Sequence, residues 1–136
     1  MAERITILEF VEKYTRQYSD LTFLREKPDK EWTETSFETT RLEAYRIAAG
    51  LMTLGIEKGD KVSLLSEGRN LWVIGELGIL YSGAVNVPLS IKLEEGGDLV
   101  FRIRHSDSRM VMVSASQLPK IRKILPDLPQ VEKVIV

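Results

Sequence analysis

Short strand patterns and helix patterns alternate along the chain from Lys61 onward, and this alternation restricts the possible folds more than any other feature. The strand patterns cover residues 61–66, 84–87, 109–113 and 131–136, and the helix patterns cover 71–82, 99–105 and 114 to about 125. Repeated strand–helix–strand units bring successive strands into a parallel sheet with helices on its faces. The sequence therefore predicts an α/β fold of three layers, in which residues 61–136 form a core of βαβ units around a mostly parallel sheet.

Two helices are predicted ahead of this core. Residues 6–9 and 35–38 each fit a capping box, in which Ser or Thr is followed three residues later by Glu. These boxes predict one helix over 7–18 and a second from 37 to about 54, with Gly55 as a left-handed C-cap. The buried face of the second helix is expected to carry Leu42, Tyr45, Ala49 and Met52.

The segment between these helices is expected to form a charged loop over 25–30 and a short strand over 31–36, with Trp32 on one face of the strand. Most of the large aromatic side chains are interpreted as core residues rather than as a recognition surface. This interpretation covers Trp32, Phe37, Tyr45 and Trp72.

The helix predicted over 71–82 is apolar on almost all sides, so we expect several neighbouring elements to bury it. Gly75 and Gly78 cost helix propensity in its interior, which indicates close contact with a strand or helix. Pro88 is expected to stop the strand that follows. The N-caps expected for the three core helices are Asn70, Asp98 and Ser114.

Composition and charge exclude several classes of function. The 136 residues carry a net charge of −1, whereas nucleic-acid binding needs a basic surplus, so no nucleic acid is expected as a partner. With no cysteine and a single histidine, the chain has no disulfide, thiolate zinc site or multi-histidine metal site. Residues 71–87 are apolar but broken by Glu76 and glycines, and no signal-peptide pattern is present. We therefore expect a cytoplasmic protein.

No known catalytic motif is present, because the sequence lacks the glycine-rich phosphate loops and the nucleophile elbow of hydrolases. The loop 66–70 follows a predicted strand and precedes a predicted helix. Ligands favour that edge of a parallel sheet, and a helix N-terminus attracts anions. Two interpretations of this loop stay open: a plain connection, and a loop that lines a ligand site.

Two charged clusters are interpreted as structural features. A basic cluster near the end of the helix predicted over 99–105 is expected to be a solvated helix end, with a phosphate contact as the alternative. Its members are Arg102, Arg104, His105 and Arg109. An acidic cluster around a pair of glycines is expected to be a flexible loop rather than a metal cage. Its members are Glu94, Glu95 and Asp98.

The helix predicted over 7–18 carries an apolar stripe formed by Ile7, Phe10, Val11, Tyr14 and Tyr18. Such a stripe can dock on the sheet, pair with another chain or lie on a membrane surface. The outer residues of this helix carry charges of both signs, whereas membrane-surface helices favour Lys and Arg. We therefore favour docking, or a homodimer contact through this helix.

Three segments within residues 46–89 resemble the opening of the AMP-forming acyl-CoA synthetases. They read RIAAGL at 46–51, LGIEKGDKV at 54–62 and LGILYSGAVNVPL at 77–89. Flanking residues agree with the long-chain fatty-acid–CoA ligase branch of this adenylate-forming superfamily, so the resemblance covers about 21–136. These flanking residues are 23–27, Trp32, Phe37, Glu38, His105, Ser106 and 111–114.

The resemblance implies a single partial domain over 1–136. This domain comprises an N-terminal helix (1–20), a strand and helix lead-in (21–60) and the βαβ core (61–136). It further implies a parent enzyme that uses ATP and Mg²⁺ to convert a fatty acid into an acyl-adenylate, and then transfers the acyl group to coenzyme A. The catalytic motifs of the family occur further along its members, so no catalytic or metal-binding residue is assigned here. The remainder of the ligase is the implied partner, and the chain alone is expected to be inactive.

Part of the loop departs from the family pattern. The family often has an Asn-Arg-x-Glu-Trp run after the first core strand, whereas this chain reads EGRNLW at 67–72. We predict that Arg69, Asn70 and Trp72 line part of the substrate cleft of the parent enzyme. A location of the parent enzyme at a membrane surface is the alternative to a purely cytoplasmic one. Two alternatives remain: a non-catalytic interaction or dimerisation module that uses the first helix, and a ligand-binding domain that uses the 66–70 edge.

Overall fold

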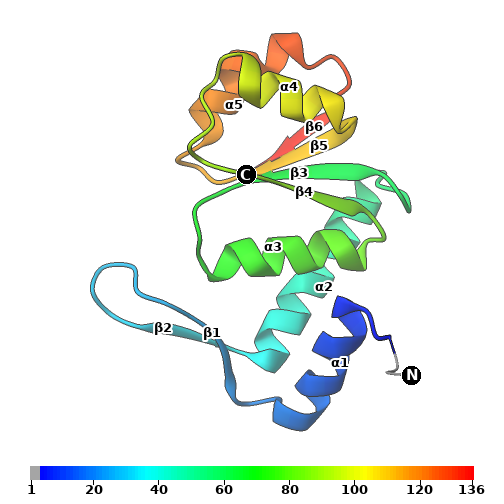
Figure 1. Cartoon of the computed structure of the whole chain (residues 1–136). Helices are drawn as coiled ribbons and strands as arrows, with labels where there is room; N and C mark the ends of the chain where they lie inside the picture. Colours follow the sequence, from blue (N-terminus) through cyan, green and yellow to red (C-terminus); the bar gives the residue numbers. More distant parts are fainter. Residues whose placement is uncertain (1–3) are drawn as a thin grey trace.

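The computed structural model describes residues 4–136 and contains an α/β unit with a smaller helical and hairpin extension (Figure 1). The elements in chain order are α1 (Ile7–Tyr18), β1 (Thr22–Glu26), β2 (Thr33–Ser36), α2 (Phe37–Thr53), β3 (Lys61–Leu65), α3 (Asn70–Tyr81), β4 (Val85–Leu89), α4 (Gly97–His105), β5 (Ser108–Val113), α5 (Leu118–Ile124), the 3₁₀ turn η1 (Leu125–Asp127) and β6 (Lys133–Ile135). Among these described residues, no helix is both long and apolar enough to cross a membrane.

The sheet is parallel throughout and has the strand order β4-β3-β5-β6. Helices α4 and α5 cover one of its faces, and α2 and α3 cover the other, so the unit has three layers. This arrangement confirms the predicted α/β fold with βαβ units. The chain leaves β3 toward β4 on one side and returns to β5 on the other, so β3 and β5 flank the point where the strand order reverses.

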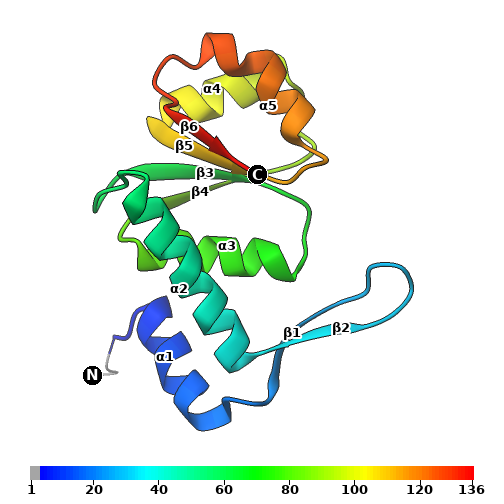
Figure 2. The same cartoon turned by 180° about the vertical axis from the view of Figure 1, so that it is seen from behind.

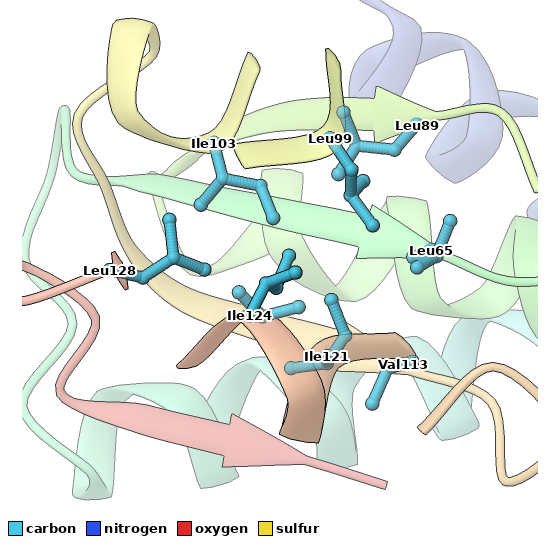
Figure 3. Close-up of a cluster of buried hydrophobic side chains, with 9 residues drawn as sticks. Leu65, Leu89, Leu99, Ile103, Val113, Ile121, Ile124 and Leu128 are labelled. Atoms are coloured by element: carbon cyan, nitrogen blue, oxygen red, sulfur yellow. The ribbon is translucent and has the colours of Figure 1, made fainter. Parts of the chain in front are cut away.

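Each face of the sheet has its own apolar core. The core under α4 and α5 contains Leu65, Leu99, Ile103, Val111 and Ile121, all fully buried (Figure 3). The opposite core joins the sheet to α2 and α3, and it is built from Leu51, Ile56, Val62, Leu64, Ile79, Ala84 and Met110. A smaller cluster of Val11, Ala44 and Leu77 joins α1 to α2 and α3.

The two glycines inside α3 make the close contacts that their low helix propensity predicted. A Cβ at Gly78 would lie 2.5 Å from Cγ2 of Ile47 on α2. A Cβ at Gly75 would lie 3.2 Å from the sulfur of Met112 on β5. α3 therefore fits between α2 and the sheet only because these positions lack side chains. Gly55 ends the α2 segment with a φ of +99°, as the sequence predicted.

The predicted buried face of α2 is wrong. Leu42, Tyr45, Ala49 and Met52 are all exposed, and Met52 retains 58% of its accessible surface. The buried face instead carries smaller residues together with one leucine: Thr40, Ala44, Ala48 and Leu51. Small side chains let α2 approach the glycine face of α3, so this packing overrides the distribution of large apolar residues. Figure 2 shows α2 crossing α3 below the sheet.

The helix starts also differ from the expected caps. Ser36, rather than Thr35, caps α2 by accepting a hydrogen bond from the backbone N–H of Thr39 at 3.1 Å. The N-cap positions of the core helices are Arg69, Gly96 and Gln117, without side-chain capping bonds, rather than Asn70, Asp98 and Ser114. Only α1 has the predicted capping box, formed by Thr6 and Glu9.

An antiparallel hairpin of β1 and β2 projects from the body of the molecule. β1 was not predicted, and the expected loop at 25–30 is wrong for Arg25 and Glu26, which lie in the strand. Trp32 lies outside β2 and is 59% exposed, so its assignment to the core is also wrong. The cationic groups of Arg25 and Lys27 lie 5.2 and 5.6 Å from its ring centre, a cation–π arrangement that suits a solvated indole.

β4 continues through Pro88 to Leu89, although Pro88 was expected to end it. β4 is an edge strand, where a residue without a backbone N–H is tolerated. β4 therefore remains paired with β3 over its full length, up to the contact of Leu65 with Leu89.

The first helix docks on α2 and α3 rather than on the sheet. Val11 and Thr15 are buried at this contact. The carboxylate of Glu12 accepts hydrogen bonds from the hydroxyls of Tyr45 on α2 and Tyr81 on α3, the latter at 2.9 Å. Much of the predicted apolar stripe faces away from this contact, because Ile7 and Phe10 remain 64% and 44% exposed.

Candidate functional site

Two loops meet at the carboxyl ends of β3 and β5, where the strand order of the sheet reverses. In open α/β sheets this position forms a crevice that commonly binds ligands. One loop follows β3 over residues 66–69, and the other follows β5 over residues 114–117. The backbone N–H of Ser114 donates to the carbonyl of Leu65 at 3.0 Å, which holds the start of the second loop beside the first.

Glu67 bridges the two loops through its side chain. Its carboxylate accepts hydrogen bonds from the hydroxyl of Ser116 and from Nε2 of Gln117, the latter at 2.9 Å. These donors, Ser116 foremost, hold the pKa of Glu67 at about 2, although partial burial opposes the charged form. The crevice therefore contains a carboxylate that stays ionised at neutral pH.

A pocket of about 300 Å³ opens beside this bridge, between α2, α3 and the carboxyl ends of β3, β5 and β6. This volume is at the lower end of the range for small-molecule sites. The lining is mainly aliphatic: Ile47, Gly50, Leu51, Leu54, Leu64, Leu71, Gly75, Met112, Val113, Ile135 and Val136, with Ser66, Arg69 and Ser114 as the polar members. The pocket is thus an apolar cavity with a short polar margin.

Among residues 4–136, Arg69 has the only charged side chain in this lining. It occupies the N-cap position of α3 and is exposed. Within residues 4–136, its guanidinium has no hydrogen-bond or ion-pair partner in the structure. A cation placed beside an apolar pocket and free of a protein carboxylate is available to pair with an external anion.

The other two predicted site residues have different surroundings. Asn70 is buried, and its Nδ2 donates to the hydroxyl of Thr35 at 3.1 Å. Its backbone N–H donates to the carboxylate of Glu26 at 2.8 Å, so Asn70 joins the hairpin to the start of α3. Trp72 is partly buried against the core formed by α2, α3 and the sheet. The structure thus brings Arg69 into the pocket lining, whereas Asn70 and Trp72 are not part of that lining.

The sequence did not identify Ser116 and Gln117 as partners of Glu67, or Gly50 as a pocket residue. Ser116 and Gln117 are 49 and 50 residues from Glu67 and meet it only because β3 and β5 pair. The available signal was topological: both loops follow strands of one parallel sheet and so must lie at the same edge. No sequence pattern marked Gly50 as a pocket residue, because a single glycine within a predicted helix does not indicate a cavity.

The basic cluster divides in the structure. Arg109 lies at the amino end of β5 and pairs with Asp60 at 2.5 Å and with Glu132 at 2.9 Å. These carboxylates raise its pKa, so this part of the cluster is a structural ion-pair network. Arg102, Arg104 and His105 occupy the last turn of α4, consistent with the helix-end interpretation. The acidic cluster forms no group suited to holding a metal among the described residues.

Comparison with known sequences and structures agrees with this architecture. The sequence model of the AMP-binding enzyme family matches residues 11–136. A medium/long-chain-fatty-acid–CoA/3-oxocholest-4-en-26-oate–CoA ligase of Mycobacterium marinum is 32% identical over 94 residues, which are 69% of this chain and 17% of the relative. A 4-hydroxybutyrate–CoA ligase of Metallosphaera sedula is 26% identical over 120 residues, which are 88% of this chain and 21% of the relative.

Among solved structures, an anthranilate CoA ligase in complex with anthranoyl-AMP superposes with a TM-score of 0.88 at 25% identity. The superposition covers 100% of this chain and 26% of that chain. The N-terminal domain of FACL13 from Mycobacterium tuberculosis shares the fold, with a TM-score of 0.82 at 24% identity over 93% of this chain and 32% of that one.

The chain belongs to the AMP-binding enzyme family. The curated proteins named above as its relatives are acyl-CoA ligases. Its fold is that of the N-terminal domain of adenylate-forming ligases. The chain spans about a fifth of the length of the curated relatives that it matches.

Proposed function

We propose that these 136 residues are the N-terminal portion of a long-chain fatty-acid–CoA ligase. The whole enzyme would activate a fatty acid with ATP and Mg²⁺ to an acyl-adenylate and then transfer the acyl group to coenzyme A. The observation that carries the proposal is the family match over residues 11–136. Several matched relatives are named as ligases of medium- or long-chain fatty acids, which supports the choice of substrate class.

The chain is proposed to have no ligase activity by itself. No glycine-rich phosphate loop occurs in its sequence. Among the residues that the structure describes, the crevice offers one free cation, Arg69, and one carboxylate that is already hydrogen-bonded, Glu67. Stabilising a transferring phosphoryl group requires several cations and donors around it. ATP, Mg²⁺ and coenzyme A are therefore assigned to the whole enzyme, and the remainder of the ligase is the proposed partner of this chain.

The test has two steps. Reading the gene beyond the codon for Val136 should reveal a Ser/Thr/Gly-rich phosphate loop in the same frame. The protein encoded by the complete frame should then form hexadecanoyl-CoA and pyrophosphate from hexadecanoate, ATP, Mg²⁺ and coenzyme A, whereas the purified 136-residue chain should form neither. Turnover by the short chain would contradict the proposed inactivity, and a clear preference for 4-hydroxybutyrate or anthranilate would contradict the long-chain assignment.

A non-catalytic dimerisation module is the second candidate, and the observation in its favour is the exposed apolar part of α1. Ile7 and Phe10 lie on the side of the helix that faces solvent. If this surface joins two copies, light scattering of the 136-residue chain should give the mass of a dimer, and Ile7→Glu should restore a monomer. A monomeric wild-type chain across the micromolar range would contradict this candidate.

A further inference from the structure

The solvent side of α4 carries an aromatic residue at its centre. Leu99 and Ile103 are buried against the sheet, and Phe101 is two positions from each of them, about 200° around the helix. Phe101 therefore lies on the outside of the molecule and retains 62% of its accessible surface (Figure 1). Its ring stacks on the imidazole of His105, with 5.2 Å between the ring centres and 13° between the planes. This contact holds the ring in a defined orientation, which suits the anchor of an interface.

An open depression of about 380 Å³ lies beside this ring. It is lined by Gly97, Val100, Phe101, Arg104 and His105, all of which belong to α4. Gly97 contributes no side chain, and a Cβ placed there would meet no atom within 4 Å. The helix thus presents a projecting ring and a hollow next to it, the combination by which two identical helices can pack against each other.

The charges of α4 are separated along its length. Its beginning is acidic, with Glu94 shortly before it and Asp98 in its first turn, and its end is basic, with Arg102 and Arg104 in its last turn. These four residues are exposed, and their charged groups have no hydrogen-bond or ion-pair partner among residues 4–136. An acidic protein, a basic protein or an anionic membrane surface would therefore be repelled by one end of the helix. A partner with the opposite order of charges is attracted at both ends.

An antiparallel copy of α4 has that opposite order. Asp98 and Arg104 are each three residues from Phe101, so they lie about 4.5 Å before and after it along the helix axis. A two-fold axis at Phe101 places Asp98 of one copy level with Arg104 of the other, and it does so twice. We propose that two copies of this chain associate through α4 in an antiparallel pair centred on Phe101, with the acidic start of each helix beside the basic end of the other.

The ring and the charges have different roles in this interface. Exposed ion pairs contribute little to affinity, so the two rings supply most of the binding free energy. The charges set the register, because a parallel pair would place Asp98 beside Asp98. A helix of nine residues covers less than the about 1,600 Å² of a standard interface, so the dimer should be weak and should depend on concentration. The proposal is independent of the ligase assignment, since it concerns only surface residues of this chain.

Three variants of the 136-residue chain separate these contributions. Phe101→Ser removes the ring from an exposed position. Asp98→Arg makes α4 basic at both ends, whereas the double substitution R102E/R104E makes it acidic at both ends. Arg69→Glu, at the start of α3 on the opposite face of the sheet, is the matched control for charge reversal at an exposed arginine.

The measurement is sedimentation equilibrium from about 10 μM to about 1 mM, with circular dichroism to verify folding. The wild-type chain and Arg69→Glu should shift from monomer toward dimer over this range. Phe101→Ser should weaken the association about tenfold or more. Asp98→Arg and R102E/R104E should each remain monomeric, because like charges then face each other in the homodimer. An equimolar mixture of these two proteins should dimerise again, since each basic helix then faces an acidic one.

A wild-type chain that stays monomeric up to about 1 mM would overturn the proposal. A dimer that Phe101→Ser leaves unchanged, or a mixture of folded charge-reversed chains that stays monomeric, would do the same. If a charge-reversed chain fails to fold, Phe101→Ser still decides, because it changes only an exposed ring. Ile7→Glu separates this dimer from one formed through α1: it should leave the α4 dimer intact, and loss of the dimer would overturn the assignment to α4. None of these results affects the ligase assignment.

Discussion

Gly78 of α3 lies so close to Ile47 of α2 that a Cβ on the glycine would come within 2.5 Å of Cγ2 and 2.6 Å of Cβ of the isoleucine. Both contact atoms belong to a β-branched side chain near its backbone, so Ile47 has little freedom to move away. This contact sets the distance between the two helices that cover one face of the sheet, and it leads to the first prediction.

Gly78→Ala should destabilise the chain by about 1–3 kcal/mol, because the added methyl group overpacks the α2–α3 contact. Urea unfolding followed by circular dichroism measures the change. Gly50→Ala is the matched control, since Gly50 is also in a helix but has open space around it. That substitution should raise the free energy of unfolding by up to about 1 kcal/mol through helix propensity. Equal effects of the two substitutions would contradict the predicted steric cause.

Glu12 should make the attachment of α1 depend on pH. Burial of this carboxylate favours its neutral form, but hydrogen bonds from Tyr45, Tyr81 and Arg41 outweigh that effect and lower its pKa. A lowered folded-state pKa contributes stability that is fully present above the unfolded value, about 4.3, and is lost as the pH falls through the folded value. The protection factors of amides in α1, which correct for the intrinsic pH dependence of exchange, should therefore fall as the pH drops below the unfolded pKa.

Glu12→Gln tests the same contact at neutral pH. It should cost about 1–2 kcal/mol in the free energy of unfolding, because the carboxylate is replaced by a weaker acceptor for three donors. It should also remove most of the pH dependence of the protection factors in α1. Glu43→Gln is the control, since Glu43 pairs with Arg46 on the exposed side of α2 and should change the stability by less than about 0.5 kcal/mol.

The hydroxyls of Ser63 and Ser108 form a buried hydrogen bond of 2.7 Å between β3 and β5. Ser108→Ala should cost about 1–3 kcal/mol, because the hydroxyl of Ser63 then stays buried without this partner. Ser63→Ala should cost less, because the hydroxyl of Ser108 keeps its hydrogen bond of 2.8 Å with the hydroxyl of Ser106. The double substitution should cost less than the sum of the two single ones, since no unpaired hydroxyl of this pair then remains. A double-mutant cycle in urea measures the coupling, and strict additivity would contradict it.

Ser116 should account for much of the acidity of Glu67. Its hydroxyl is the main cause of the low pKa of this carboxyl, which lies at about 2. Ser116→Ala should therefore move the pKa toward the ordinary value of Glu, and a carbon-detected NMR titration of the Glu67 side chain measures the shift. Ser90→Ala provides the control, because its hydroxyl bonds only to the backbone of Lys92. An unchanged Glu67 titration in Ser116→Ala would refute the assigned cause.

The sequence predicted the elements of the α/β core better than it predicted their contacts. The alternation of strands and helices after Lys61 was sufficient for the parallel sheet, because that topology follows from connection length and handedness. The buried face of α2 was predicted wrongly, because the prediction gave more weight to the large side chains of Leu42 and Met52 than to Ala44 and Ala48. The small residues of α2 face inward because α3 packs closely against α2 at Gly78, and a single-sequence pattern on α2 does not contain that contact.

The hairpin and the candidate site were also predicted only in part, because they too depend on features that a local sequence pattern does not reveal. β1 was missed because it has only five residues and its two apolar residues, Phe23 and Leu24, are adjacent, which leaves no apolar alternation to detect. The loop 66–70 was correctly placed at the carboxyl edge of the sheet, and Arg69 lies at a pocket there. The partners of Glu67 come from a loop 49 residues away, so single-sequence reasoning had no spacing from which to find them.

Pro88 makes the two borders of the sheet unequal. A strand that paired with the free edge of β4 would lack the backbone donor of Pro88, the fourth of the five residues of β4, whereas β6 contains no proline. Lateral growth of the sheet is thus discouraged at β4 and permitted at β6. We expect any additional strand that joins this sheet to lie next to Val134, so that the sheet extends in a single direction.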